Sequence, residues 1–234
     1  MATANKSGNL YLKLVPIMLS FFAMSFVDLV GTGTNFIKKD FGLSDTMAGL
    51  FPLMVFLWFL IFSVPTGLLM NRIGRRKTVL ISLVVTALAL LLPVLTIPMP
   101  HNTASFTIML VSFCLLGIGN AIMQVSLNPL LSNIVHGDRL ASALTLGQFV
   151  KAIGSFVAPI IAGWAALEFG NWKLLYPIFT GISILAVLSL GVTKIEEEDE
   201  KGEASTFRQC LALLGNGFVL LAFLGIVCHV GIDV

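Results

Sequence analysis

Two charged residues lie inside long apolar stretches of the sequence. Asp28 is the only Asp, Glu, Lys or Arg in residues 14–37, and Lys151 is the only one in residues 140–167. If these stretches cross a membrane, each charge costs about 2.5–3.5 kcal/mol on insertion scales, so such residues usually face a cavity or a partner. We therefore expect Asp28 and Lys151 to bind a substrate or a proton, or else to form a structural ion pair.

The two charges need not meet at the same depth. Counted from the expected cytoplasmic ends of their helices, Lys151 lies about nine residues in and Asp28 about sixteen, so their depths differ by roughly 10 Å at 1.5 Å per residue. The sequence is compatible with a direct pair but does not imply one.

Amide side chains form a second group of candidate site residues. Gln124 and Asn128 are four residues apart and so share one face of a helix. Pro129 removes a backbone hydrogen bond, and we expect the helix to bend near it. Polar side chains at such a bend, facing inward, suit the hydroxyl groups of a sugar. Hydrogen bonds between helices use the same residue types, so spacing alone leaves both interpretations open.

The composition identifies the environment of these residues. Of the 234 residues, 57% are hydrophobic and only 11% are charged, against about 25% in an ordinary soluble domain. The mean hydropathy is +0.97. These values exclude a soluble enzyme, a nucleic-acid-binding protein and a disordered chain. The net charge of +2 indicates no partner. The three cysteines are widely spaced, and we find no motif for a metal or an organic cofactor.

Charge-free stretches predict the number of membrane helices. A membrane helix needs about 20 apolar residues, so the stretch 78–137, which lacks Asp, Glu, Lys and Arg, holds two. Every backbone polar group in lipid must be satisfied within its own segment, which favours helices. We therefore predict an all-α polytopic membrane protein. The six expected spans are 12–37, 47–69, 78–98, 106–134, 142–167 and 174–193.

The same pattern divides the chain into three parts. Residues 1–193 form the expected amino-terminal six-helix bundle, and residues 194–208 form a charged, solvated linker. A further apolar stretch occupies 209–234, which we interpret as the start of a second bundle whose seventh helix is truncated; a short final helix is the alternative. With the N-terminus in the cytoplasm, ten Lys and Arg residues fall inside and three outside. This balance predicts that the N-terminus and the linker are cytoplasmic. The membrane is expected to be the plasma membrane, which in a bacterium is the inner membrane.

The loop after the second span carries a spaced motif, GLLMNRIGRRK, over residues 67–77. It resembles the signature between the second and third helices of the major facilitator superfamily, in which an acid stands where this chain has Asn71. The resemblance implies a transporter of twelve helices, so that a second six-helix half is expected. It also implies that this loop controls the exchange of conformations. The expected gating residues are Gly67, Asn71, Arg72, Gly74, Arg75 and Arg76.

Within that superfamily the chain resembles the group of fucose–proton symporters and glucose/galactose permeases. The resemblance rests on Asp28, on Gln124-x-x-x-Asn128-Pro129 and on Gln148-x-x-Lys151. It implies proton-coupled symport of a monosaccharide or a similar small polar metabolite by alternating access. Gln124 and Lys151 replace a glutamate and an asparagine of the fucose symporter. The site would therefore hold one acid and one base, and Lys151 either neutralises Asp28 or binds an acidic sugar.

Other functions remain as alternatives. The pattern Gly154-x4-Pro159-x3-Gly163 loosely resembles the antiporter motif of drug exporters, which keeps a drug or metabolite antiporter open. A membrane-embedded enzyme would need a nucleophile with a base, or metal ligands, within the spans, and we find neither. A receptor or structural role gives no reason for charges inside the membrane.

Overall fold

The protein is built from helices. The computed structural model describes residues 2–195, 197, 209 and 212–233, and every regular element within those residues is an α-helix or a 3-10 helix. The predicted all-α class is therefore confirmed. Six helical segments are long and apolar enough to cross a membrane, as the charge-free stretches predicted: Leu12–Phe41, Asp45–Ile73, Arg75–Leu95, Thr103–Ser132, Arg139–Phe169 and Trp172–Val192.

The first span is interrupted in a way that the sequence did not predict. It consists of α1 (Ala2–Met24), the 3-10 helix η1 (Ser25–Leu29) and α2 (Val30–Phe41). Within a long helix, a 3-10 segment often marks a functional hinge, because its tighter winding changes the hydrogen-bond ladder. Asp28 lies in this segment, so the charged residue and the irregular backbone coincide.

A short turn connects α2 to the helix that follows it. Gly42, with φ of +61°, ends α2 in the left-handed conformation that favours glycine. It leads into the short α3 (Asp45–Ala48) and then α4 (Leu50–Ile73). The other elements are α5 (Arg75–Leu95), α6 (Thr103–Ser132), α7 (Arg139–Phe169), η2 (Trp172–Leu174), α8 (Leu175–Val192), η3 (Leu213–Gly215) and α10 (Gly217–Asp233).

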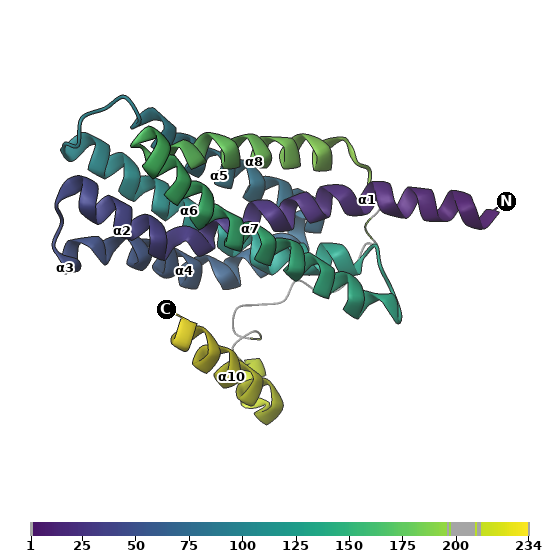
Figure 1. The fold of residues 1–234 in the computed structure, drawn as a ribbon. Helices are drawn as coiled ribbons and strands as arrows, with labels where there is room; N and C mark the ends of the chain where they lie inside the picture. Colours follow the sequence, from purple (N-terminus) through teal and green to yellow (C-terminus); the bar gives the residue numbers. More distant parts are fainter. Residues whose placement is uncertain (1, 196, 198–208, 210–211, 234) are drawn as a thin grey trace.

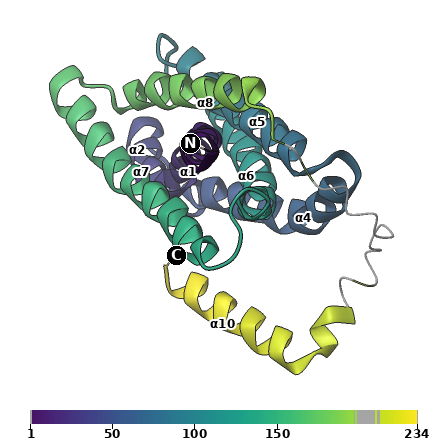
Figure 2. The same cartoon turned by 90° about the vertical axis from the view of Figure 1, so that its right-hand side faces the viewer.

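The helices from α1 to α8 form one elongated bundle. The N-terminus and the turn between α6 and α7 lie at one end of it, and α3 lies at the other end (Figure 1). Viewed along the bundle, α1 lies in the middle, among α5, α6, α7 and α8 (Figure 2). The aromatic contacts of Phe26 in η1 with Tyr176 and Phe179 join the first span to α8. This packing positions η1 inside the bundle, with α7 beside it.

Glycine permits the closest approach between α4 and α6. A Cβ atom added at Gly117 would lie 2.4 Å from the backbone oxygen of Val55, which no side chain could tolerate. Small residues at such crossings let membrane helices pack by van der Waals contact where lipid supplies no hydrophobic driving force. The crossing fixes α6, and with it the amide side chains further along that helix.

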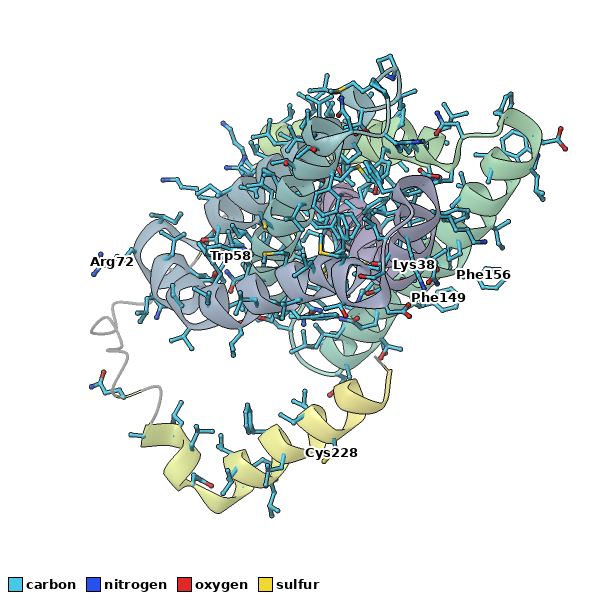
Figure 3. The ribbon with its side chains drawn as sticks, turned by 90° about the vertical axis from the view of Figure 1, so that its left-hand side faces the viewer. Lys38, Trp58, Arg72, Phe149, Phe156 and Cys228 are labelled. Atoms are coloured by element: carbon cyan, nitrogen blue, oxygen red, sulfur yellow. The ribbon has the colours of Figure 1, made fainter. Side chains whose placement is uncertain are left out.

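Two of the spans leave most of their surface uncovered. In the most apolar windows, 17% of the α4 span and 22% of the α7 span are buried, against at least 39% for each of the other spans. Phe149 and Phe156 project from α7 away from the bundle (Figure 3). The described side chains of α10 are also almost all exposed, and this helix lies beside the bundle rather than within it (Figures 1 and 2).

Candidate substrate-binding site and cytoplasmic loop

Asp28 and Lys151 form an ion pair inside the bundle. The ammonium nitrogen of Lys151 lies 3.3 Å from Oδ2 of Asp28. The same oxygen accepts a hydrogen bond from the hydroxyl of Ser155, one turn further along α7. The difference in depth that we estimated from the sequence does not keep the two charges apart. Ser155 was not among the candidate residues, although its spacing of four from Lys151 would have indicated a shared face.

The close approach of α7 to the first span brings the pair together. Gly147 and Gly154 lie on the same side of α7 as Lys151, one turn on either side of it. A Cβ atom at Gly154 would lie 2.1 Å from the hydroxyl oxygen of Ser25, and one at Gly147 would lie 2.6 Å from the ring of Phe21. These glycines hold α7 against α1 and η1, so the long lysine side chain reaches Asp28.

The pair is only partly covered by the bundle. The side chain of Asp28 is 37% exposed and that of Lys151 is 18% exposed. Gln148, three residues before Lys151 on the same helix, is exposed, and its side chain makes no hydrogen bond within the described part of the chain. The charges are thus accessible from one side of the bundle, which is the arrangement that a binding site needs.

The amides of α6 supply uncommitted hydrogen-bonding groups. Gln124 and Asn128 are half-buried. Among the described residues, Oδ1 of Asn128 is buried without a hydrogen-bond partner, and so is Oδ1 of Asn120, which was not a candidate from the sequence. Buried acceptors in native proteins normally have a partner, so an unpaired one calls for an explanation such as a ligand or water. Pro129 lies three residues before the end of α6, so the bend expected there falls in the last turn.

The loop between α4 and α5 is held by the chain that follows α8. Gly74, at φ of +90°, turns the chain into α5. The backbone N–H groups of Arg75 and Arg76 then donate to the two carboxylate oxygens of Glu197, at 2.6 and 2.5 Å. A carboxylate at this position satisfies the free N–H groups of the first turn and complements the positive end of the helix dipole. A Cβ atom at residue 74 would lie 2.6 Å from the same carboxylate, so glycine also leaves room for it.

The six expected gating residues divide into two sets. The guanidinium of Arg76 donates to the backbone oxygens of Leu190 and Gly191 at the end of α8, at 3.1 and 2.8 Å. The guanidinium of Arg75 donates to the side chain of Asn133. These two arginines therefore brace the bundle.

Gly67, Asn71 and Arg72 lie in the last two turns of α4, and no described residue braces them in this way. Asn71 and Arg72 are exposed, and Arg72 projects from the end of α4 away from the bundle (Figure 3). No atom within 4 Å would obstruct a Cβ at Gly67. The basic loop thus combines a braced part with an accessible part.

Two of the described positions in the predicted linker 194–208 lie against the bundle, whereas Lys194 is exposed. Ile195 is buried, and Glu197 caps α5 as described above. Residue 197 is drawn inward because the first turn of α5 offers unpaired N–H donors, which sequence composition does not reveal. Most of the predicted linker 194–208 lies outside the described residues.

The described residues contain no metal-binding cluster. No group of three or more His, Cys, Asp and Glu side chains among them could hold a metal ion. The chemistry of the bundle interior is that of one ion pair with hydroxyl and amide groups, which can bind a polar solute.

Six apolar spans define a polytopic integral membrane protein, and the charge pair within them is typical of a transporter. The family model described as "Major Facilitator Superfamily" matches residues 17–234. The chain belongs to this superfamily.

Two kinds of curated relative match part of the chain. Glucose/galactose transporters of two Brucella abortus strains are 29% identical to it over 126 residues, covering 53% of this chain and 29% of each transporter. A lysosomal dipeptide transporter, MFSD1 of Bos taurus, is 25% identical over 187 residues, covering 79% of this chain and 38% of that protein. The predicted resemblance to the glucose/galactose permease group is confirmed by the first two. The chain spans less than half the length of these relatives.

Solved structures show the same fold. A structure of proton-dependent oligopeptide transporters superposes with a TM-score of 0.64 at 17% identity, over 97% of this chain and 49% of that one. A bacterial homologue of the human peptide transporters PepT1 and PepT2 gives a TM-score of 0.63 at 17% identity, over 97% and 51%. The chain therefore has the fold of about half of such a transporter.

Proposed function

We propose that this protein is a secondary active transporter that moves a monosaccharide or a similar small polar metabolite together with protons, by alternating access. The observation that carries the proposal is the partly exposed ion pair of Asp28 and Lys151 beside a 3-10 break in the first span. A charge pair inside a membrane bundle is costly to keep for packing alone, and it marks sites of ion or substrate passage.

The substrate class is supported by the relatives and by the side chains. The Brucella proteins are glucose/galactose transporters. In the present chain, Gln124, Asn128 and Gln148 add amide groups on the two helices that flank Asp28, and amides pair well with hydroxyl groups. We assign these three residues, with Asp28 and Lys151, to substrate binding or proton coupling.

The membrane arrangement follows from the distribution of charge. We infer that the N-terminus and the α4–α5 loop are cytoplasmic, in a plasma membrane or bacterial inner membrane, because Lys and Arg concentrate at that end. A second six-helix half is expected to cover the exposed faces of α4 and α7, with residues 209–234 as its beginning. The loop 67–76 then controls the exchange between the outward-open and inward-open states.

The test is uptake by the complete protein in liposomes. We expect a radiolabelled monosaccharide to accumulate when the outside is acidified and to stop accumulating when a protonophore collapses the gradient. Asp28→Asn should remove the dependence of uptake on the proton gradient while leaving exchange of substrate between the two sides largely intact. Proton-driven accumulation that is unchanged in Asp28→Asn would return the pair to a structural role.

Chemical labelling tests the orientation separately. Single cysteines in place of Lys77, on the predicted cytoplasmic side, and of Asn102, on the opposite side, are exposed in whole cells to a membrane-impermeant thiol reagent. These variants are made in a background in which the native cysteines are replaced. We expect labelling at residue 102 and protection at residue 77, and the reverse pattern would invert the topology.

A further inference from the structure

We propose that the site carries an acidic polyhydroxy compound, of the sugar-acid type, together with one proton, and that the Asp28–Lys151 pair makes this transport electrically neutral. The inference rests on the proposed function, because it assigns the substrate class and the stoichiometry to the same site. We derive the inference by comparing the net charge of the empty site with its net charge when substrate and proton are bound.

The empty site has a net charge of zero. Lys151 on α7 is the charged group in contact with Asp28. The other neighbours of η1 add none at this level: α6 contains no Asp, Glu, Lys, Arg or His, and α1 contains none after Lys13. On α2 the charges lie at the far end, from Lys38 onward. Tyr176 of α8 is buried against Phe26. One carboxylate and one ammonium therefore set the charge of the site.

An anionic substrate can use Lys151 only if Asp28 is neutralised. Removing one partner of a partly covered ion pair leaves the other charge uncompensated inside the bundle, which is unfavourable. A proton from the medium removes this cost when it binds the carboxylate of Asp28. The ammonium of Lys151 then exchanges Oδ2 of Asp28 for the carboxylate of the substrate. No covalent bond of the substrate changes, and the charge of the site is zero in both states.

The geometry of Asp28 favours this exchange. Its contacts with Lys151 and with the hydroxyl of Ser155 both use Oδ2. Within the described part of the chain, Oδ1 makes no polar contact, so it can take the proton without displacing Ser155. Ser155 can continue to hold the neutral carboxyl group in place while Lys151 turns to the substrate.

The amides account for the hydroxyl groups. For Oδ1 of Asn128 and Oδ1 of Asn120, which are buried acceptors on α6, the described part of the chain provides no donor, and α6 contacts η1. Substrate hydroxyl groups are donors of the kind that these atoms lack. A sugar acid offers a carboxylate to Lys151 and hydroxyl groups to the amides. A neutral sugar offers only the hydroxyl groups, so the ion pair between Asp28 and Lys151 would stay intact.

The predicted stoichiometry has an electrical consequence. A monoanion carried with one proton moves no net charge, whereas a neutral sugar carried with one proton moves one positive charge. A zwitterion such as a dipeptide could replace both partners of the pair without any proton. The three substrate types thus respond differently to a pH gradient and to a membrane potential.

The experiment measures uptake of D-glucuronate, D-glucose and L-alanyl-L-alanine by the complete protein in liposomes. One arm imposes an acidic exterior with the potential clamped at zero by potassium and valinomycin, and the other imposes a potential at equal pH. Protein-free liposomes are the control for diffusion of the protonated acid. We expect the pH gradient to raise protein-dependent glucuronate uptake at least tenfold, and the potential to change it less than twofold.

Three results would overturn the proposal. Faster uptake of glucose than of glucuronate, driven by a negative interior, assigns a neutral substrate and leaves the proposed function intact. If the dipeptide is taken up and its uptake does not change with the pH gradient or the membrane potential, the substrate is a zwitterion. Absence of protein-dependent uptake for all three probes removes the proposed function itself, and this inference with it.

Variants of Lys151 add a second test. Lys151→Gln should lower glucuronate uptake at least tenfold, and Lys151→Arg, which keeps the positive charge, should retain much of it. Equal uptake by wild type and Lys151→Gln would contradict the proposal. The electrical measurement on the wild type stands even if a variant fails to fold.

Discussion

The carboxylates of Asp28 and Glu197 are held by different kinds of contact. Asp28 uses one oxygen to contact two side chains, and it is partly exposed inside the bundle. Glu197 uses both oxygens to bind two backbone N–H groups at the start of α5. A lysine or serine side chain can swing to another partner at the cost of a rotamer change, whereas a backbone N–H can leave only if the helix moves.

This difference separates a group suited to exchange from a group suited to fix a position. The Asp28 pair can open toward a substrate without rearranging the bundle. Opening the Glu197 contacts would release α5 from the chain that follows α8. Under the proposed function, we interpret the first as the exchangeable part of the site and the second as a clasp that holds α5 to the chain that follows α8.

The largest effect is expected when the two helices of the ion pair are forced apart. In Gly154→Ala the new methyl group would lie 2.1 Å from the hydroxyl and 2.8 Å from the Cβ of Ser25. Overpacking of this kind typically costs about 1–3 kcal/mol, and we expect the upper part of that range with loss of most transport. Thermal unfolding in detergent and liposome uptake measure the two effects.

The matched control lies on the same helix. A Cβ at Gly163 would meet no atom within 4 Å, so Gly163→Ala should leave stability and uptake close to those of the wild type. Similar losses in both variants would show that glycine acts here through general helix properties and not through the approach of α7 to Ser25.

The next largest effect is a difference in unfolding free energy between variants of Arg76, which is braced, and Arg72, which is exposed. Arg76→Ala removes the guanidinium from the carbonyl groups of Leu190 and Gly191, and hydrogen bonds to charged groups contribute about 1.5–3 kcal/mol each at most. We expect a loss of about 1.5 kcal/mol in the unfolding free energy. Arg72→Ala, at an exposed position, should change stability by less than about 0.5 kcal/mol.

Transport and binding distinguish the two roles further. Both variants should slow uptake while substrate affinity, measured by equilibrium binding, stays near the wild-type value, because the loop acts on conformational exchange. A fall in affinity in step with uptake would remove the gating assignment.

A smaller effect is expected at the clasp. Glu197→Ala removes the carboxylate from two N–H groups of α5, and loss of a helix N-terminal cap usually costs about 1 kcal/mol. Glu168→Ala is a suitable control, since Glu168 is exposed at the other end of the bundle. The expected result is a lower melting temperature for the first variant alone. An unchanged melting temperature in Glu197→Ala would mean that the clasp contributes nothing to the stability of the folded protein.

The smallest effect is expected at Ser155. Ser155→Ala removes one hydrogen bond to Asp28 and leaves the ion pair in place, so about 0.5 kcal/mol is at stake, or a twofold to threefold change in apparent substrate affinity. Uptake as a function of substrate concentration measures it. A loss as large as that of Lys151→Gln would make Ser155 a principal ligand and not a positioning residue.

The sequence predicted the architecture more fully than the site. The six spans agree with the charge-free stretches because insertion into lipid depends on the local apolarity and length of each segment. The basic loop and the family were likewise readable from residues 67–77. Asp28 and Lys151 could also be found from the sequence, because each is a charged residue within a long apolar stretch, where lipid disfavours charge.

The sequence determined that one acid and one base lie within the membrane, and the tertiary structure decided that they touch. Contact depends on the rotation, tilt and separation of the helices, which are set by packing between segments far apart in the chain. The 3-10 turn at Asp28, the glycine contacts of α7 and the capping of α5 by Glu197 belong to this second kind. None has a local signature, because each arises where one segment meets the backbone or side chains of another.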